Sequence, residues 1–147
     1  LGALDAVSSV SGGNFQLIRV TVEAIGPANR LRENLVLRVL SETGYDMIPI
    51  NPRPGLEEIR GLKVYPSLNA IDRPVDMVEV FRKPKDLPAI TEEAVAIGAK
   101  VLWGQIGVYN EDAARIAEDA GMRVVMNRCP KIELFRPFWK PKLHLEI

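Results

Sequence analysis

The chain has 147 residues, and its 19 basic and 19 acidic side chains give a formal net charge of zero. A domain of this length buries a substantial core, and the balanced charge gives no indication of nucleic acid or an anionic membrane as a partner. One cysteine excludes an internal disulfide, and no apolar run is long enough for a membrane-spanning helix. Because a basic and apolar leader is also missing, we expect a cytoplasmic protein.

The first part of the chain after residue 14 alternates between apolar, β-branched runs and amphipathic runs. Leu17–Ile25 is predicted as a strand. Leu31–Thr43 places apolar residues on one helical face, and the Gly44 that follows favours the end of a helix. Tyr45–Ile50 is predicted as a second, buried strand.

The middle of the chain is less regular, and the alternation then resumes. Arg53–Ser67 contains two prolines and two glycines, and it is predicted as a loop with one helical turn and a short extended piece at Lys63-Val64. Asp76 and Glu79 are expected near the ends of the next strand or turned toward polar surroundings. The further strands are predicted at Val75–Val80, Val101–Gln105 and Arg123–Asn127, and the further helices at Leu87–Ile97 and Asn110–Ala120.

Short apolar strands that alternate with amphipathic helices indicate the α/β class. Right-handed crossovers then give a Rossmann-like, doubly wound parallel sheet of about five strands, for which we predict the order 3-2-1-4-5 with helices on both faces. We expect this domain to span residues 15–135. Residues 1–14 are expected to form a flexible segment, and residues 136–147 a tail that covers the sheet or mediates self-association.

Ligands of such sheets bind beyond the carboxyl ends of the strands, and three of the predicted strand ends are followed by an arginine: Arg53, Arg82 and Arg128. The first of these is part of Asn51-Pro52-Arg53, where NAD-binding folds place an acidic residue that binds the free 2′-hydroxyl. A guanidinium binds phosphate oxygens in pairs, so this stretch favours CoA or NADP over NAD. A strand-ending turn with a solvated arginine is the alternative.

The turn after the first predicted strand contains one glycine, Gly26, and lacks the G-x-G-x-x-G pattern. Pro27 has no N–H, so phosphate donors in this turn would be Ala28, Asn29 and the following helix N-terminus, with Arg30 adding positive charge. A plain connection between strand and helix is the alternative.

Residue patterns typical of catalysis are missing from the sequence. His144 is the sole histidine and Cys129 the sole cysteine, so we expect a surface or packing role for the first and an inert thiol for the second. No spacing typical of metal ligands occurs. The sequence therefore favours a binding protein without catalysis of its own.

Four stretches follow one another in a familiar order: GYDMIPINP (44–52), VDMVEVFR (75–82), AVAIGAKVLWGQIG (94–107) and VVMNRCPKIE (124–133). Together they resemble the small stand-alone CoA-binding domain proteins, whose fold is that of the N-terminal domain of the succinyl-CoA synthetase alpha subunit. The resemblance covers about residues 34–135. At the first turn the family usually has small residues and a serine after the glycine, where this chain has Pro27.

The resemblance implies coenzyme A bound across the strand ends. It implies phosphates at the Gly26 turn, the adenosine end beside Asn51 and Arg53, and the pantetheine near Gln105 and Gly107. We expect an apolar floor at Phe81 and Ile106 for the less polar arm of the ligand. The candidate cofactor-binding residues are Gly26, Ala28, Arg30, Asn51, Arg53, Phe81, Arg82, Lys83, Gln105, Ile106, Gly107 and Arg128.

The expected function is capture of coenzyme A or an acyl-CoA by arginines and helix N-termini. Two alternatives stay open. The resemblance also fits a subunit or relative of an NDP-forming acyl-CoA synthetase, which relays phosphate through a histidine on a further domain. An NADP-binding redox or regulatory domain shares the arginine argument but needs a richer glycine turn. The expected protein partner is a second copy of the chain or an ATP-grasp-type subunit.

Overall fold

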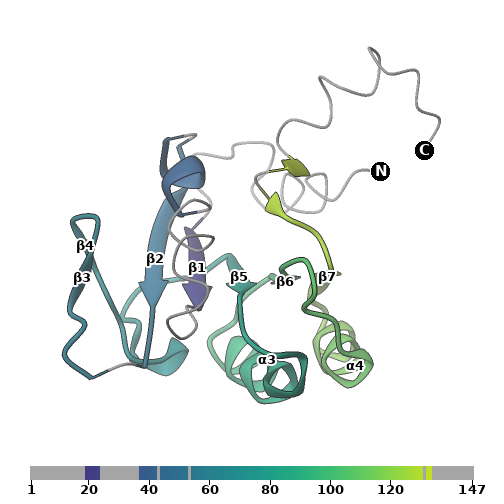
Figure 1. Ribbon diagram of the computed structural model, residues 1–147. Coiled ribbons are helices and arrows are strands. Elements are labelled where there is room, and N and C mark those ends of the chain that lie inside the picture. Colours follow the sequence, from purple (N-terminus) through teal and green to yellow (C-terminus); the bar gives the residue numbers. More distant parts are fainter. Residues whose placement is uncertain (1–18, 24–36, 43, 53, 131, 134–147) are drawn as a thin grey trace, which may run out of the picture.

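The computed structural model describes residues 19–23, 37–42, 44–52, 54–130 and 132–133 (Figure 1). Its centre is a sheet of five parallel strands in the spatial order β2-β1-β5-β6-β7. The strands are β1 (Arg19–Glu23), β2 (Asp46–Ile50), β5 (Met77–Val80), β6 (Val101–Gly104) and β7 (Arg123–Val125). The predicted α/β class and its parallel sheet are therefore confirmed.

The predicted strand order 3-2-1-4-5 is wrong. It placed residues 75–80 outside β2, whereas β5 pairs with β1 on the other side. The position outside β2 is taken by a single parallel bridge, because the Tyr65 N–H donates to the Pro49 carbonyl and the Asn51 N–H donates to the Tyr65 carbonyl, each at 3.0 Å. The stretch Arg53–Ser67 is rich in proline and glycine, and it has too few consecutive extended residues to form a full strand beside β2.

For residues 53–67 the sequence predicted a loop that contains one helical turn. The structure has a hairpin in this region instead. β3 (Glu58–Ile59) pairs antiparallel with β4 (Leu62–Lys63). The two linking residues, Arg60 and Gly61, both have positive φ, at 51° and 78°, as a type I′ hairpin turn requires. The only helical turn nearby among the described residues comes later, as the 3-10 helix η3 (Leu68–Ala70).

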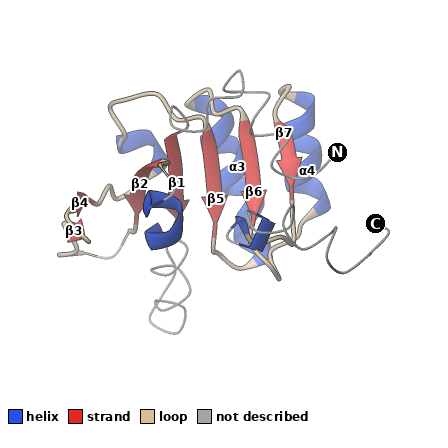
Figure 2. Ribbon diagram, turned by 90° about the horizontal axis from the view of Figure 1, so that it is seen from above, coloured by secondary structure: helices blue, strands red, loops and turns tan. Residues whose placement is uncertain are grey.

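Two helices pack on one face of the sheet, as Figure 2 shows. α3 (Leu87–Ala96) follows the 3-10 helix η4 (Pro84–Asp86), and α4 (Glu111–Asp119) follows β6. Their buried residues form one apolar cluster with alternate residues of the strands, and its members include Ile48, Val78, Ile90, Ala94, Leu102, Ala113 and Ala117.

The opposite face is covered by the helical residues 37–42, which confirms helices on both faces. Their Leu37 and Leu40 join a second cluster with Met77 and Trp103. Because both faces of the sheet are covered, its central strands are buried on both sides, and all four residues of β5 and of β6 are buried.

Glu79 lies near the carboxyl end of its strand, as expected, but it does not face polar surroundings. It lies in β5 opposite Trp103 of β6 and has no exposed surface. Neither carboxyl oxygen has a hydrogen-bond partner among the described residues. Burial, and next the neighbouring Cys129, raise the pKa of the Glu79 carboxyl well above its usual value. A strand that is covered on both faces has no polar side, so either orientation of this side chain leads to burial.

Where the remaining element boundaries fall among the described residues, they agree with the predicted ones to within one or two residues. The predicted starts at Leu17 and Leu31, and the predicted ends at Ile25 and Thr43, lie outside the described residues. The clearest difference is at the last strand, which was predicted to reach Asn127 but ends at Val125, because Asn127 has a left-handed backbone with φ of 59°. Among the described residues, no helix has the length and hydropathy needed to cross a lipid bilayer. The predicted terminal segments 1–14 and 136–147 lie outside the described residues.

Candidate ligand site at the carboxyl edge of the sheet

The parallel strands all end at one edge of the sheet, which we call the carboxyl edge. After β1 the chain moves to β2 on one side and then returns to β5 on the other. Such a switch in strand order is where open α/β sheets bind ligands. The connection that leaves β1, with the predicted Gly26, Ala28 and Arg30, lies outside the described residues, and so does Arg53 after β2.

The connection after β5 carries a group of positive charges, Arg82–Lys85, which we call the basic segment. Phe81, just before it, is buried in the cluster on the Trp103 face, so it anchors the segment to the sheet. The Arg82 guanidinium lies 3.5 Å from the Asp86 carboxylate, and both side chains are about one third exposed. Lys83 is exposed at the start of η4. A partly exposed ion pair at this distance contributes little, so a phosphate can compete with Asp86 for the arginine.

The connection after β6, Gln105–Tyr109, is a tightly fixed turn that we call the apolar loop. A side chain on Gly104 would place its Cβ 2.5 Å from the Val108 carbonyl oxygen, so this approach requires glycine. The Val108 N–H donates to the Gln105 carbonyl at 2.8 Å, and Gly107 has a φ of 85°. These contacts fix the turn against the sheet while Ile106 and Tyr109 are exposed to solvent.

Gln105 presents an unusual polar group at this edge. The side chain is only 3% exposed, and its amide oxygen is buried without a hydrogen-bond partner among the described residues. Its backbone N–H donates to the Val80 carbonyl at 3.1 Å and so continues the pairing of β6 with β5. Buried polar atoms are rarely left unpaired in folded proteins, so this oxygen is a candidate acceptor for a ligand donor.

The segment after β7 completes the described part of the edge. Asn127 Oδ1 accepts a hydrogen bond from the Gly107 N–H at 2.9 Å, which joins this segment to the apolar loop. The Arg128 carbonyl accepts from the Trp103 indole N–H at 2.8 Å. The Arg128 guanidinium donates to the Asn127 carbonyl and lies 3.9 Å from Glu133. The sequence pointed to this segment through Arg128 and through Asn127 at the predicted strand end, and asparagine is a residue that tolerates the left-handed backbone found at this position.

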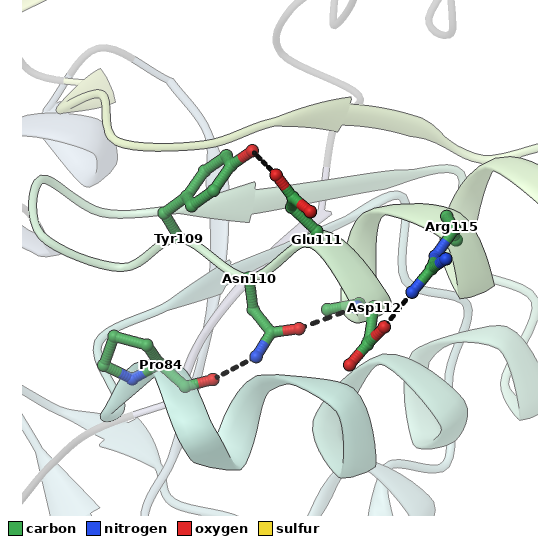
Figure 3. Close-up of polar contacts among 7 residues, drawn as sticks. Pro84, Tyr109, Asn110, Glu111, Asp112 and Arg115 are labelled. Carbon is green, nitrogen blue, oxygen red and sulfur yellow. Dashed lines mark hydrogen bonds and ion pairs between the residues drawn. The ribbon is translucent and has the colours of Figure 1, made fainter.

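Asn110 connects the apolar loop to the basic segment (Figure 3). Its side-chain oxygen accepts from the Ala113 N–H at 3.0 Å and caps α4, while its side-chain nitrogen donates to the Pro84 carbonyl at 3.1 Å. The first turn of α4 also carries Glu111 and Asp112. These carboxylates disfavour an anion at this helix N-terminus, so phosphate binding is better suited to the basic segment.

Of the twelve predicted site residues, eight lie within the described part. Asn51 follows β2, where its N–H pairs with Tyr65, and the other seven occupy the three neighbouring connections after β5, β6 and β7. The expected apolar floor is divided, because Phe81 is buried in the core while Ile106 is exposed. Cys129 is buried. Among the described residues, no group of three or more histidine, cysteine or acidic side chains could hold a metal ion.

The fold is that of Rossmann-like α/β domains. The family model of the CoA binding domain matches residues 29–134, and the chain belongs to this family. The range agrees with the resemblance over about residues 34–135 that the motifs indicated.

Two relatives are similar over most of their length. The uncharacterised protein YneT of Bacillus subtilis (strain 168) is 34% identical over 114 residues, which cover 78% of this chain and 83% of that protein. A solved structure of a hypothetical protein from Pyrococcus horikoshii OT3 is 34% identical with a TM-score of 0.79, and the match covers 92% of each chain.

A larger enzyme shares the fold. The dinucleotide-forming acetyl-coenzyme A synthetase 1 of Ca. Korarchaeum cryptofilum, solved with phosphate and ADP, is 20% identical with a TM-score of 0.65. The match covers 86% of this chain but only 28% of that enzyme, so the likeness concerns the architecture of one part of it.

Proposed function

We propose that this protein binds coenzyme A or an acyl-CoA at the carboxyl edge of the sheet and has no catalytic activity of its own. The observation that carries the proposal is the family match over residues 29–134, in a fold whose switch point lies beside a basic segment. A free and buried Cys129 suits the reducing cytoplasm as the place of this function.

The basic segment is the proposed phosphate site within the described residues. A guanidinium at Arg82 can bind two phosphate oxygens at once, and the carboxylate of Asp86, which forms an ion pair with it, is partly exposed, so a doubly charged phosphate can replace that carboxylate. Lys83 adds a second positive charge from the same connection. Arg128 supplies a further guanidinium two strands away, beyond β6.

The other predicted residues complete the proposal. Asn51 and Arg53 are proposed for the adenosine end, and the turn with Gly26, Ala28 and Arg30 for the phosphates. Gln105 and Gly107 are proposed for the pantetheine, whose amide N–H groups are suitable donors for the unpaired Gln105 oxygen. The loop N–H of Gly107 already donates to Asn127, so the contact of this glycine with the ligand would be steric.

Isothermal titration with CoA, dephospho-CoA and NADP tests the proposal. We expect CoA to bind more tightly than dephospho-CoA, because only the 3′-phosphate differs, and we expect NADP to bind more weakly than CoA. Equal affinity for CoA and dephospho-CoA would remove the role of Arg53. No heat of binding with CoA would refute the proposal as a whole.

A matched pair of variants tests the basic segment. Arg82→Gln removes one positive charge at the carboxyl edge and should weaken CoA binding about tenfold, the effect of losing about 1.4 kcal/mol of a charged hydrogen bond. Arg73→Gln removes the same charge from an ion pair with Asp46, which opens β2 at the opposite edge, and should leave the affinity nearly unchanged. Equal losses in the two variants would indicate a general charge effect.

The second candidate function is that of a subunit related to NDP-forming acyl-CoA synthetases. The fold likeness to part of the acetyl-coenzyme A synthetase favours it. Activity would then require an ATP-grasp-type partner, and affinity purification from native extract should recover such a subunit in a fixed ratio. Self-association through residues 136–147 is a further proposal, which sedimentation of the full chain and of a chain ending at residue 135 would test.

A further inference from the structure

The two large hydrophobic side chains that stand exposed in the described part of the chain lie on the same short loop. Ile106 is 45% exposed and Tyr109 is 55% exposed. Single exposed hydrophobic residues are normal on a protein surface. Two of them within four residues, at the edge where the ligand is proposed to bind, suggest a contact surface.

Contacts on both sides of the loop hold it in place. Gly107 and Asn127 both have positive φ, at 85° and 59°, and they are joined by the hydrogen bond from the Gly107 N–H to Asn127 Oδ1. Between the two exposed side chains, Val108 is buried in the core. Ile106 and Tyr109 are therefore presented by a fixed backbone, and a ligand that contacts them loses little free energy in ordering the loop.

Charges of both signs lie next to the loop. Asn110 bonds to the Pro84 carbonyl and so keeps the loop beside the basic segment with Arg82 and Lys83. Directly after Asn110, Glu111 and Asp112 open α4. An anionic group is favoured at the basic segment and disfavoured next to these carboxylates, so the exposed surface at Tyr109, beside Glu111, suits a neutral and apolar part of the ligand.

We infer that Ile106 and Tyr109 form the contact surface for the acyl group of a bound acyl-CoA, so that the protein binds acyl-CoA more tightly than free CoA. The inference rests on the proposed function. It assigns the phosphates to the basic segment and the acyl chain to the apolar loop. The tyrosine hydroxyl is directed to the Glu111 carboxylate, at 3.4 Å, which leaves the face of its ring for the acyl chain.

Affinity should then increase with the length of the acyl chain. An open surface covers about half of each methylene, so we expect roughly a twofold tighter dissociation constant per methylene between acetyl-CoA and hexanoyl-CoA. Isothermal titration with CoA, acetyl-CoA, butyryl-CoA and hexanoyl-CoA measures this series on the full chain.

Variants of the two side chains test their role. Ile106→Ser and Tyr109→Ser should each flatten the dependence on chain length. Tyr109→Ser should also leave the affinity for free CoA within about twofold of the parent, since free CoA has no acyl chain to lose contact with this side chain. Tyr109→Phe is the matched control, because it keeps the ring and loses only the hydroxyl bond to Glu111, and it should retain the dependence. Circular dichroism of each variant confirms that the exposed substitutions leave the fold intact.

Each outcome decides between the two proposals. If the parent binds neither CoA nor its esters, the proposed function fails. If the parent binds CoA and all esters equally, the acyl contact is refuted while CoA binding stands. If Tyr109→Ser weakens CoA and hexanoyl-CoA by the same factor, the loop contacts the pantetheine and the inference is also refuted.

Discussion

Replacing Glu79 with glutamine changes a carboxyl group that the fold buries completely. Neither oxygen has a hydrogen-bond partner among the described residues, and burial, followed by the neighbouring Cys129, raises the pKa of this carboxyl well above its usual value. Glutamine has nearly the same shape and carries no charge at any pH. The substitution therefore isolates the contribution of ionisation to stability.

The sign and the magnitude follow from proton linkage. An unfolded chain releases the glutamate proton near about pH 4.3, whereas the folded protein retains it until its raised pKa is reached. The stability that this protonated group contributes is fully present below about pH 4.3 and is lost as the pH rises through the folded pKa. Within that window the free energy of unfolding of the parent should fall by about 1.4 kcal/mol per pH unit relative to Glu79→Gln.

Urea unfolding followed by circular dichroism, at half-unit steps from about pH 5 to about pH 7, measures this difference. Glu92→Gln is the control, because Glu92 is exposed on α3 and its curve should run parallel to that of the parent. Groups common to all three proteins cancel in the comparison. Parallel curves for Glu79→Gln and the parent would show that folding does not hold this proton and would refute the reasoning.

Substitutions at three further positions test contacts that shape the carboxyl edge. Gly104→Ala places a methyl group 2.5 Å from the Val108 carbonyl oxygen and should destabilise the protein by about 1–3 kcal/mol; an unchanged melting temperature would mean that the apolar loop shifts freely. Asn110→Ala removes the cap of α4 and should cost about 1 kcal/mol in urea unfolding, whereas Asn110→Asp keeps the cap and should cost less. Trp103→Phe removes the indole bond to the Arg128 carbonyl and should cost at least about 1 kcal/mol, and equal stability of variant and parent would contradict a role for that bond.

The sequence could predict those residues of the candidate site that come directly after a strand. Phe81, Arg82 and Gln105 lie within two residues of the ends of apolar strands, and a parallel sheet brings all such positions to one edge. Tyr109 was missed because an aromatic residue before a helix carries no local sign of exposure. The bond between Asn110 and Pro84 was missed because it joins residues 26 positions apart.

Local sequence was sufficient for the class of the fold, the positions of the main strands and helices, and the family, because periodicity, turn residues and motifs are properties of neighbouring residues. Tertiary contacts were needed to establish which strand lies beside β1 and that Tyr65 provides the outer position next to β2. They were also needed to show that Glu79 is buried with no hydrogen-bond partner among the described residues. These features depend on contacts between distant segments. The sequence pattern of a strand indicates which face of the sheet each side chain lies on. Whether that face is exposed to water depends on the helices that pack above and below the sheet.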